Sequence, residues 1–392
     1  MIAILTPTFR GHFDFISEYI KSINENALNK QELKIYFVLS GSEIYEFEER
    51  FSSCLKGSID YELINFDELL ENKGFNLTSE EALRAFDKYT YQTLKKLLAI
   101  EIIPCEDIFV VDSESKIIAP VDLCEIKNEY YKRGPWGLYS KVNKRKINAE
   151  FFLDLVHLHS KILGIEEIWF LEHVQWIFKK SIILDLINHF GGINNLLRVA
   201  RASSGGKTAH LFEGLLYYGW IWKNKDKYKF NFYDVDELLD VHLTKIENEK
   251  YNERFFSTYR GQAGKIEFAL SMLTKENVYA FIDLYSTVGV RVLRCENTSI
   301  SNYFLQKRLL KDLDIRVLTC SQDHWHGLNR TGLLDRIKDR KRISRYWNRF
   351  KDFKREIKYL VYLVMNGILA CCLVLLAPLK VQLFKYLERK YK

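Results

Sequence analysis

The chain has few of the residues that interrupt regular structure, with 5 prolines and 19 glycines among 392 residues. That scarcity excludes collagen-like and low-complexity sequence, and no repeat of solenoid length is present. Seven cysteines without a CxxC pair predict neither a disulfide framework nor a zinc site, and favour a reducing compartment. Met1 to Leu5 lacks both a basic segment and a long apolar run, so we expect no secretory signal peptide.

Positive charge is concentrated at one end of the chain. Residues 331–392 hold 16 Lys and Arg against 5 Asp and Glu, which leaves 42 against 46 in residues 1–330. The net charge of +7 is therefore a property of the tail, which argues against a nucleic-acid-binding globular face and suits an anionic phospholipid membrane. A content of 47% hydrophobic and 14% aromatic residues excludes a disordered chain.

An uninterrupted apolar run, Ile108 to Val111, ends in Asp112, Ser113 and Glu114. Such a run predicts a strand of a parallel sheet that is covered on both faces, and ligands bind beyond the carboxyl ends of strands of this kind. Two carboxylates one residue apart suit a hard divalent ion, Mn²⁺ or Mg²⁺, on a diphosphate. The alternative is that these acids only cap a helix or begin a turn.

The strand and its acids resemble the D-x-D or D-x-E motif of glycosyltransferases with the GT-A fold. Tyr91 to Leu97 (YQTLKKL), followed by VVDSES, is similar to a bacterial polysaccharide-cluster family of such transferases. This resemblance covers roughly the first 220 residues, at the level of motifs. It implies an α/β, GT-A-like, mostly parallel sheet flanked by helices, with Asp112 and Glu114 on the metal and Ser113 beside the nucleotide. The chain departs from the pattern at Glu114, where Asp is more usual, and at Thr93, where a second Gln is frequent.

The opening Thr6-Pro7-Thr8-Phe9-Arg10 resembles the TPT-aromatic-Arg opening of the same family. The resemblance implies that Thr6, Thr8 and Arg10 contact the nucleotide, through hydroxyl donors and a bidentate guanidinium. The alternative is a rigid turn with a surface arginine. Gln92 and Lys96 share one helix face, which either lines the cleft, where Lys96 neutralises a phosphate, or faces solvent.

Hydrophobic periodicity predicts the elements that carry these residues. Strands are expected at 2–5, 34–39, 61–64, 108–111, 166–170, 173–178, 228–233, 278–282 and 290–294. Helices are expected at 13–24, 78–98, 124–132, 151–163, 181–190, 209–218, 261–272 and 299–313. The strands 166–170 and 173–178 are expected side by side. Trp136 is expected at the tip of a turn, where it either stacks on a sugar or packs the loop onto the body.

Phe212 to Gly219 (FEGLLYYG) resembles the S-E-x-x-L-Y-G element of the family, with one residue of slip before the glycine. The resemblance implies that Glu213, with Tyr217 on the same face, is the catalytic base that takes the acceptor's proton in an inverting transferase. The alternative is a glutamate held by a neighbouring Tyr or Arg. Ser203 to Thr208 (SSGGKT) is not a P-loop, because Arg201 stands where the first glycine is required.

A polar cluster at 320–327 (CSQDHWHG) is the densest in the second half of the chain. Many GT-A enzymes return a late His or Asp to the metal, so the resemblance implies His324 or His326 as a further metal ligand. Two histidines that flank a tryptophan equally suit a surface turn.

The tail has two parts. Residues 331–358 have the pattern of a basic amphipathic helix, and 359–379 form a charge-free run between Lys358 and Lys380. As a helix this run covers ~31 Å, about the thickness of the bilayer's hydrocarbon core, so it either spans the membrane or dips and returns. We expect residues 1–330 to be the catalytic domain, with a nucleotide-binding half at 1–125 and an acceptor half at 126–330. Residues 359–392 then form the membrane helix and a basic end.

These features predict a metal-dependent glycosyltransferase at the inner (cytoplasmic) membrane, with its catalytic domain facing the cytoplasm. It would move a sugar from a nucleotide-sugar donor to a lipid-linked or oligosaccharide acceptor of a cell-surface glycan, with Asp112 aiding departure of the leaving group through the metal. The alternative is a non-catalytic membrane-tethered scaffold with a degenerate transferase fold, supported by Glu114 and the slipped Glu213 element.

Overall fold

The computed structural model describes residues 1–56, 59–141, 150–170, 176–205, 209–234, 285–295 and 314–320. The chain divides into two compact units, Met1–Leu328 and Asn329–Lys392, and every described residue belongs to the first. Several expected features lie outside the described residues: the strand 278–282, the helices 261–272 and 299–313, His324, His326, and both parts of the tail. Within the described ranges, no helix is long and apolar enough to cross a membrane.

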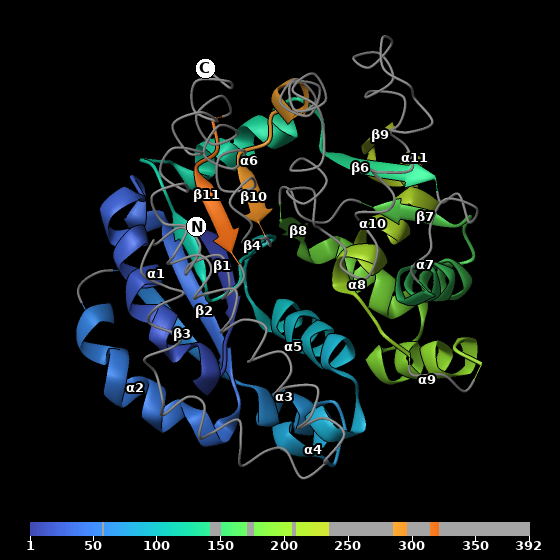
Figure 1. Ribbon diagram of the computed structural model, residues 1–392, viewed down its shortest axis with the longest axis horizontal. Coiled ribbons are helices and arrows are strands. Elements are labelled where there is room, and N and C mark those ends of the chain that lie inside the picture. The colour runs from blue at the N-terminus through green and yellow to red at the C-terminus, as the bar shows by residue number, and fades with distance from the viewer. Residues whose placement is uncertain are drawn as a thin grey trace, which may run out of the picture. The chain divides into compact units, whose positions relative to one another are not determined.

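A five-stranded sheet forms the centre of the first unit, in the order β3-β2-β1-β4-β8 (Figure 1). Its strands are β1 (Ile2–Pro7), β2 (Leu33–Leu39), β3 (Asp60–Asn65), β4 (Asp107–Val110) and β8 (Ile177–Lys179). The first four are parallel, and β8 pairs antiparallel with β4. Both faces of β1 and β2 are buried, as apolar strands between two helix layers require. The expected α/β fold with a parallel sheet is confirmed.

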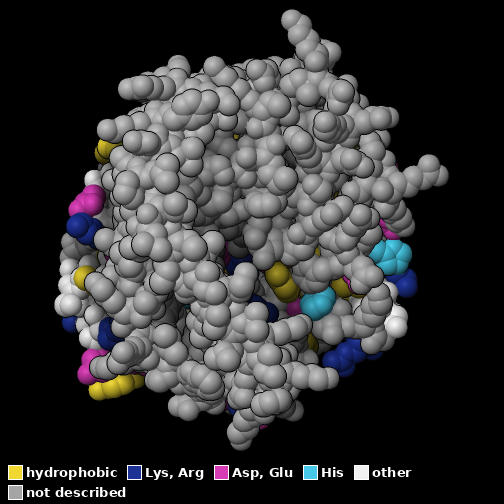
Figure 2. Space-filling view, in the orientation of Figure 1, with side chains coloured by type: hydrophobic (Ala, Val, Ile, Leu, Met, Phe, Trp, Pro, Cys, Tyr) yellow, Lys and Arg dark blue, Asp and Glu magenta, His cyan; other side chains and the backbone are white. Residues whose placement is uncertain are grey.

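Helices cover both faces of this sheet. Figure 1 shows α1 (Phe13–Asn26) and α2 (Gly41–Leu55) on one side and α5 (Lys88–Ile102) on the other. α1 buries Phe13, Ile16, Ile20 and Ile23, which recur at helical spacing. Its outer face is charged, and Arg50 of α2 pairs with Asp14 at 3.3 Å. α1 and α2 lie at the left of Figure 1, and Figure 2 shows Lys or Arg side chains next to Asp or Glu along the left edge of the same view.

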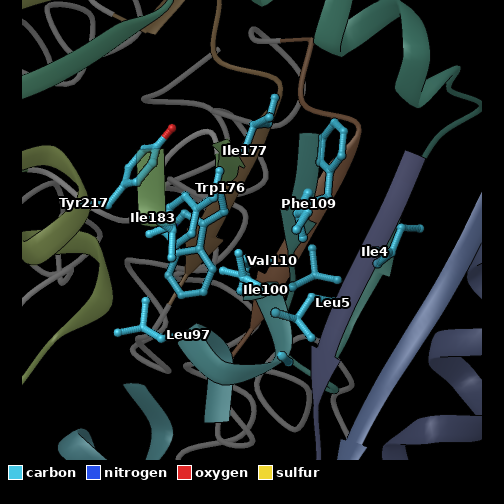
Figure 3. Packing of buried hydrophobic residues seen from close by; sticks show 14 of the residues in the cluster. Ile4, Leu5, Leu97, Ile100, Phe109, Val110, Trp176, Ile177, Ile183 and Tyr217 are labelled. Atoms are coloured by element: carbon cyan, nitrogen blue, oxygen red, sulfur yellow. The ribbon is translucent and has the colours of Figure 1, made fainter. Parts of the chain in front are cut away.

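Buried apolar side chains of α5 and the sheet pack together with those of later segments of the chain (Figure 3). The labelled members, all buried, are Ile4 and Leu5 of β1, Phe109 and Val110 of β4, Leu97 and Ile100 of α5, and Trp176, Ile177, Ile183 and Tyr217. Each fully buried side chain of this size contributes about 1.5–3 kcal/mol relative to an exposed one. The packing therefore fixes α5 on the strands, and with it the polar residues on the preceding turn of the same helix.

The helix expected at 78–98 is two helices, α4 (Ser79–Ala85) and α5. Thr78 begins α4 at the expected position, with a capping box to Glu81. The continuous helix was a wrong prediction, because Phe86 is extended and Asp87 caps a new helix by accepting from the N–H groups of Tyr89 and Thr90. The short α3 (Phe66–Asn72) precedes α4.

Two smaller sheets accompany the central one. In one, β5 (Ser115–Ile117) pairs antiparallel with β11 (Val317–Cys320), which runs parallel to β10 (Val292–Cys295). In the other, β6 (Trp136–Lys141) lies between β7 (Ile168–Phe170) and β9 (Asn231–Asp234). The strands expected at 166–170 and 173–178 are thus not neighbours, since β7 pairs with β6 and β8 with β4. Periodicity identified both strands but carries no information on the partner of each.

Trp136 is buried in β6 and not at the tip of a turn. The hydroxyl of Tyr130 donates to its carbonyl oxygen at 2.8 Å, and the two rings pack at 5.7 Å. Of the two interpretations left open, packing onto the body is correct. The helix that carries Tyr130 is α6 (Leu123–Lys132).

The remaining described helices lie in the second half of the unit. They are α7 (Glu150–Leu163), α8 (Lys180–His189), α9 (Ile193–Ser203), α10 (Glu213–Lys223) and α11 (Lys225–Tyr228). The helix expected at 209–218 begins only at Glu213. Residues 209–212 are not helical because side chains of α5 bind their backbone: the hydroxyl of Thr90 donates to the carbonyl of Ala209 and accepts from the N–H of Leu211.

Candidate functional site

The candidate site lies where the strand order of the central sheet reverses. β1 has β2 on one side and β4 on the other, and all three are parallel. Loops that leave the carboxyl ends of β1 and β4 therefore lie at the switch point of the sheet, the usual position of ligands in open α/β sheets. Thr8 to His12 follow β1, and Asp112 to Glu114 follow β4.

The acidic motif forms a tight turn between β4 and β5. The N–H of Ser115 donates to the carbonyl of Asp112 at 2.9 Å, and β5 then pairs with β11. The side chains of Asp112 and Glu114 are 22% and 10% exposed, while Ser113 is fully buried. The turn that was one of the two interpretations of this motif is thus present, and it places both carboxylates at the switch point of the sheet.

His12 joins the two loops, and the sequence interpretation missed it. Its Nδ1 lies 2.9 Å from Oγ of Ser113, and its Nε2 lies 3.7 Å from Oε2 of Glu114. The ring also packs on Phe9 at 4.3 Å. Position 12 lies two residues beyond Arg10, the end of the TPTFR segment, and only the reversal of strand order, which brings β1 beside β4, could have pointed to it.

Lys96 connects the acidic motif to α10. Its Nζ forms an ion pair with Oε1 of Glu213 and lies 3.9 Å from Oδ1 of Asp112. The ammonium also sits over the ring of Trp176, 4.8 Å from the centroid. The Lys96 side chain points inward and not toward solvent, and it is only 7% exposed.

Glu213 is enclosed on both of its carboxylate oxygens. Oε1 pairs with Lys96, and Oε2 lies 2.9 Å from the hydroxyl of Thr93. The side chain is 4% exposed. Tyr217, expected on the same face, instead accepts from the N–H of Lys179 at 3.1 Å. This enclosure suits a fixed counterion better than a base that must reach an acceptor hydroxyl.

Two further contacts hold the start of α10 in place, one from Thr93 and one from His159. The hydroxyl of Thr93 also faces the carbonyl of Leu211 at 3.0 Å. Neutral His159 of α7 accepts from the N–H of Phe212 at 3.0 Å and donates to the carbonyl of Leu155 at 2.7 Å. Burial lowers the pKa of His159 to about 4, so the ring remains an acceptor at neutral pH.

The residues of the first loop have different environments. Thr6 is buried and its hydroxyl lies 2.8 Å from that of Tyr19, so it faces the core. Thr8 is buried as well, and Nζ of Lys95 donates to its carbonyl at 2.9 Å. Arg10 is exposed and pairs with Glu46 of α2 at 2.5 Å. Thr8 and Arg10 lie in the loop at the switch point, whereas the Thr6 side chain points away from it.

Lys95, the residue before Lys96 on α5, is a buried cation that faces the loop after β1. Burial lowers its pKa to about 8, while Glu43 and Asp67 act in the opposite direction. Gln92 lies one turn before Lys96 on the same face and is half-buried. The two consecutive lysines of α5 thus have different neighbours: Lys95 binds the loop after β1, and Lys96 lies beside the acidic motif.

The donor chemistry of Asp112 and Glu114 fits a hard divalent cation, since both offer carboxylate oxygens from one short turn. Across the described part of the chain, no group of three or more His, Cys, Asp or Glu could hold a metal by itself. A cation bound to these two residues would take its remaining ligands from water, from a diphosphate, or from residues beyond the described ranges.

Comparisons with known proteins give matches among solved structures alone. No protein-family model matches the chain. No curated protein matches it either. Among solved structures, the apo form of mouse xyloside xylosyltransferase 1 is similar to this chain, with a TM-score of 0.37 and 10% sequence identity over 60% of this chain and 86% of that chain.

Proposed function

We propose that this protein is a metal-dependent glycosyltransferase that uses a nucleotide-sugar donor. The observation that carries the proposal is the placement of Asp112 and Glu114 at the switch point of a parallel sheet, with the Lys96 ammonium 3.9 Å from Asp112. Carboxylates and a cation at such a point suit a diphosphate and its divalent ion. The resemblance of the Asp112 to Glu114 and TPTFR motifs to those of GT-A transferases supports the same assignment.

In this proposal, Asp112 and Glu114 would hold Mn²⁺ or Mg²⁺, which supplies Lewis-acid stabilisation of the diphosphate leaving group. Lys96 neutralises a phosphate oxygen beside Asp112. Thr8 and Arg10 lie on the neighbouring loop, where they can contact the nucleotide. His12 holds that loop against the acidic motif through Ser113.

We further propose that the acceptor is a lipid-linked or oligosaccharide precursor of a cell-surface glycan, reached at the cytoplasmic face of the membrane. The basic and apolar tail, residues 331–392, supports this location by its composition. His324 and His326 remain candidates for further metal ligands.

Titration calorimetry of nucleoside diphosphates, each with and without Mn²⁺, tests the proposal. We expect one diphosphate to bind only with the metal, and Asp112→Ala to weaken that binding at least tenfold. Asp60→Ala is the matched control, because Asp60 is an exposed carboxylate at the far edge of the sheet. Metal-independent binding, or unchanged binding by Asp112→Ala, would exclude the metal site. Absence of binding by any nucleoside diphosphate would favour a non-catalytic scaffold.

A further inference from the structure

The start of α10 carries a carboxylate whose position is fixed from three directions. Glu213 pairs with Lys96, lies 2.9 Å from the hydroxyl of Thr93, and follows Phe212, whose N–H is bound by His159. Lys96 and Thr93 belong to α5, which the apolar core holds on β1 and β4. The Glu213 carboxylate thus has a defined location and little freedom to move.

The distances around Lys96 show how Glu213 holds the position of the Lys96 ammonium. A lysine side chain has four rotatable carbons and a strongly hydrated ammonium, so it needs partners to hold one position. Here the ammonium has Glu213 in direct contact, Asp112 at 3.9 Å and the Trp176 ring at 4.8 Å. Without the Glu213 carboxylate, Asp112 would be the nearest carboxylate, and the ammonium would move into contact with Asp112.

We propose that Glu213 is a positioning residue: together with Thr93 it holds the Lys96 ammonium beside Asp112 without letting it neutralise Asp112. Lys96 then stays oriented toward the phosphate of a nucleoside diphosphate, and Asp112 keeps its negative charge for a cation. This role rests on the proposed function, and it differs from the role of acceptor base that the family resemblance implied for Glu213.

Nucleoside diphosphate affinity measured in Mn²⁺ without acceptor separates the two roles, because a base for the acceptor hydroxyl does not affect it. We expect Glu213→Gln and Lys96→Gln each to weaken binding about tenfold or more. The double variant should bind no more weakly than Lys96→Gln, since Glu213 acts only through Lys96. Glu101→Gln is the matched control, because it breaks another ion pair of α5, to Lys73 at 2.5 Å.

A second pair of variants covers the case in which Glu213→Gln does not fold. Thr93→Ser keeps the hydroxyl that faces Glu213 and should retain affinity, whereas Thr93→Val removes it and should weaken binding several-fold. One result would overturn the positioning role and restore the role of base: wild type binds the nucleoside diphosphate, and Glu213→Gln binds it with the same affinity but no longer transfers the sugar. Additive losses in the double variant would overturn it too. If wild type binds no nucleoside diphosphate, the proposed function fails and this role fails with it.

Discussion

Lys96 and Glu213 lie 117 residues apart in the sequence and form an ion pair whose side chains are 7% and 4% exposed. Removal of one partner of a buried pair leaves an uncompensated charge and costs roughly 3–5 kcal/mol. The pair is asymmetric, because Lys96 has a second carboxylate, Asp112, at 3.9 Å. It joins α5 to α10, so its loss affects both halves of the unit.

We therefore predict that Lys96→Met lowers the free energy of unfolding more than Glu213→Leu does. Lys96→Met leaves Glu213 without a counterion, whereas Glu213→Leu leaves Lys96 with Asp112 nearby. The double variant, Lys96→Met with Glu213→Leu, should recover much of the loss because it buries no charge. Urea unfolding followed by circular dichroism measures all three. Equal losses in the two single variants, or strictly additive losses in the double variant, would contradict the buried pair.

His159 should make stability depend on pH in mildly acidic solution. Its pKa is about 4 when folded, lowered mainly by burial, against an ordinary value near 6.5. The unfolded chain therefore binds more protons between these values, and stability is lost as pH falls from about 6.5 to about 4. The maximum loss is roughly 3 kcal/mol.

His159→Gln isolates this effect, because its amide oxygen can still accept from the N–H of Phe212 but does not titrate. We expect wild type to lose more stability than the variant between pH 6.5 and pH 4, as measured by the shift in urea midpoint. Parallel curves over that range would mean that His159 is solvated, and its contact with the start of α10 would then be absent in solution.

Lys95 should act in alkaline solution, with the window set by its own shift. Burial lowers its pKa to about 8 from 10.5, so the unfolded chain binds more protons between those values. Stability should rise with pH across that window, by at most roughly 3 kcal/mol. The measurement is the difference between wild type and Lys95→Met from pH 7.5 to pH 10.5, which removes the contribution of other titrating groups. A constant difference would show that the Lys95 ammonium is hydrated.

The elements near the candidate site could be predicted because their signals are local. Ile108 to Val111 is an apolar run that ends abruptly at Asp112, and such an ending marks the carboxyl end of a buried strand whatever the rest of the chain does. The same holds for the helix start at Thr78. The boundary at Asp87 was missed because the apolar spacing of Leu83, Phe86 and Tyr91 continues across it.

The contacts that give the site its character could not be predicted, because each joins distant segments. Nothing near Glu213 in the sequence indicates that its partner is Lys96, and nothing near His12 indicates Ser113. Both pairs depend on which strands are neighbours, and a periodic pattern does not specify the neighbour. The pairing of β8 with β4 was missed for the same reason.

The last prediction concerns residues 331–392, whose sequence suggests two kinds of membrane attachment. Burial of some 20 apolar residues at ~25 cal/mol per Å² far exceeds the contribution of each Lys or Arg near anionic lipid, about 1 kcal/mol. The run at 359–379 should therefore dominate attachment, and the basic segment 331–358 should add a salt-sensitive part.

We predict that a chain ending at Arg330 stays in solution and still binds the nucleoside diphosphate. A chain ending at Lys358 should bind phosphatidylserine vesicles and leave them in high salt, and the full chain should need detergent, as vesicle flotation would measure. If salt alone releases the full chain, the run 359–379 packs inside the protein and is not a membrane segment.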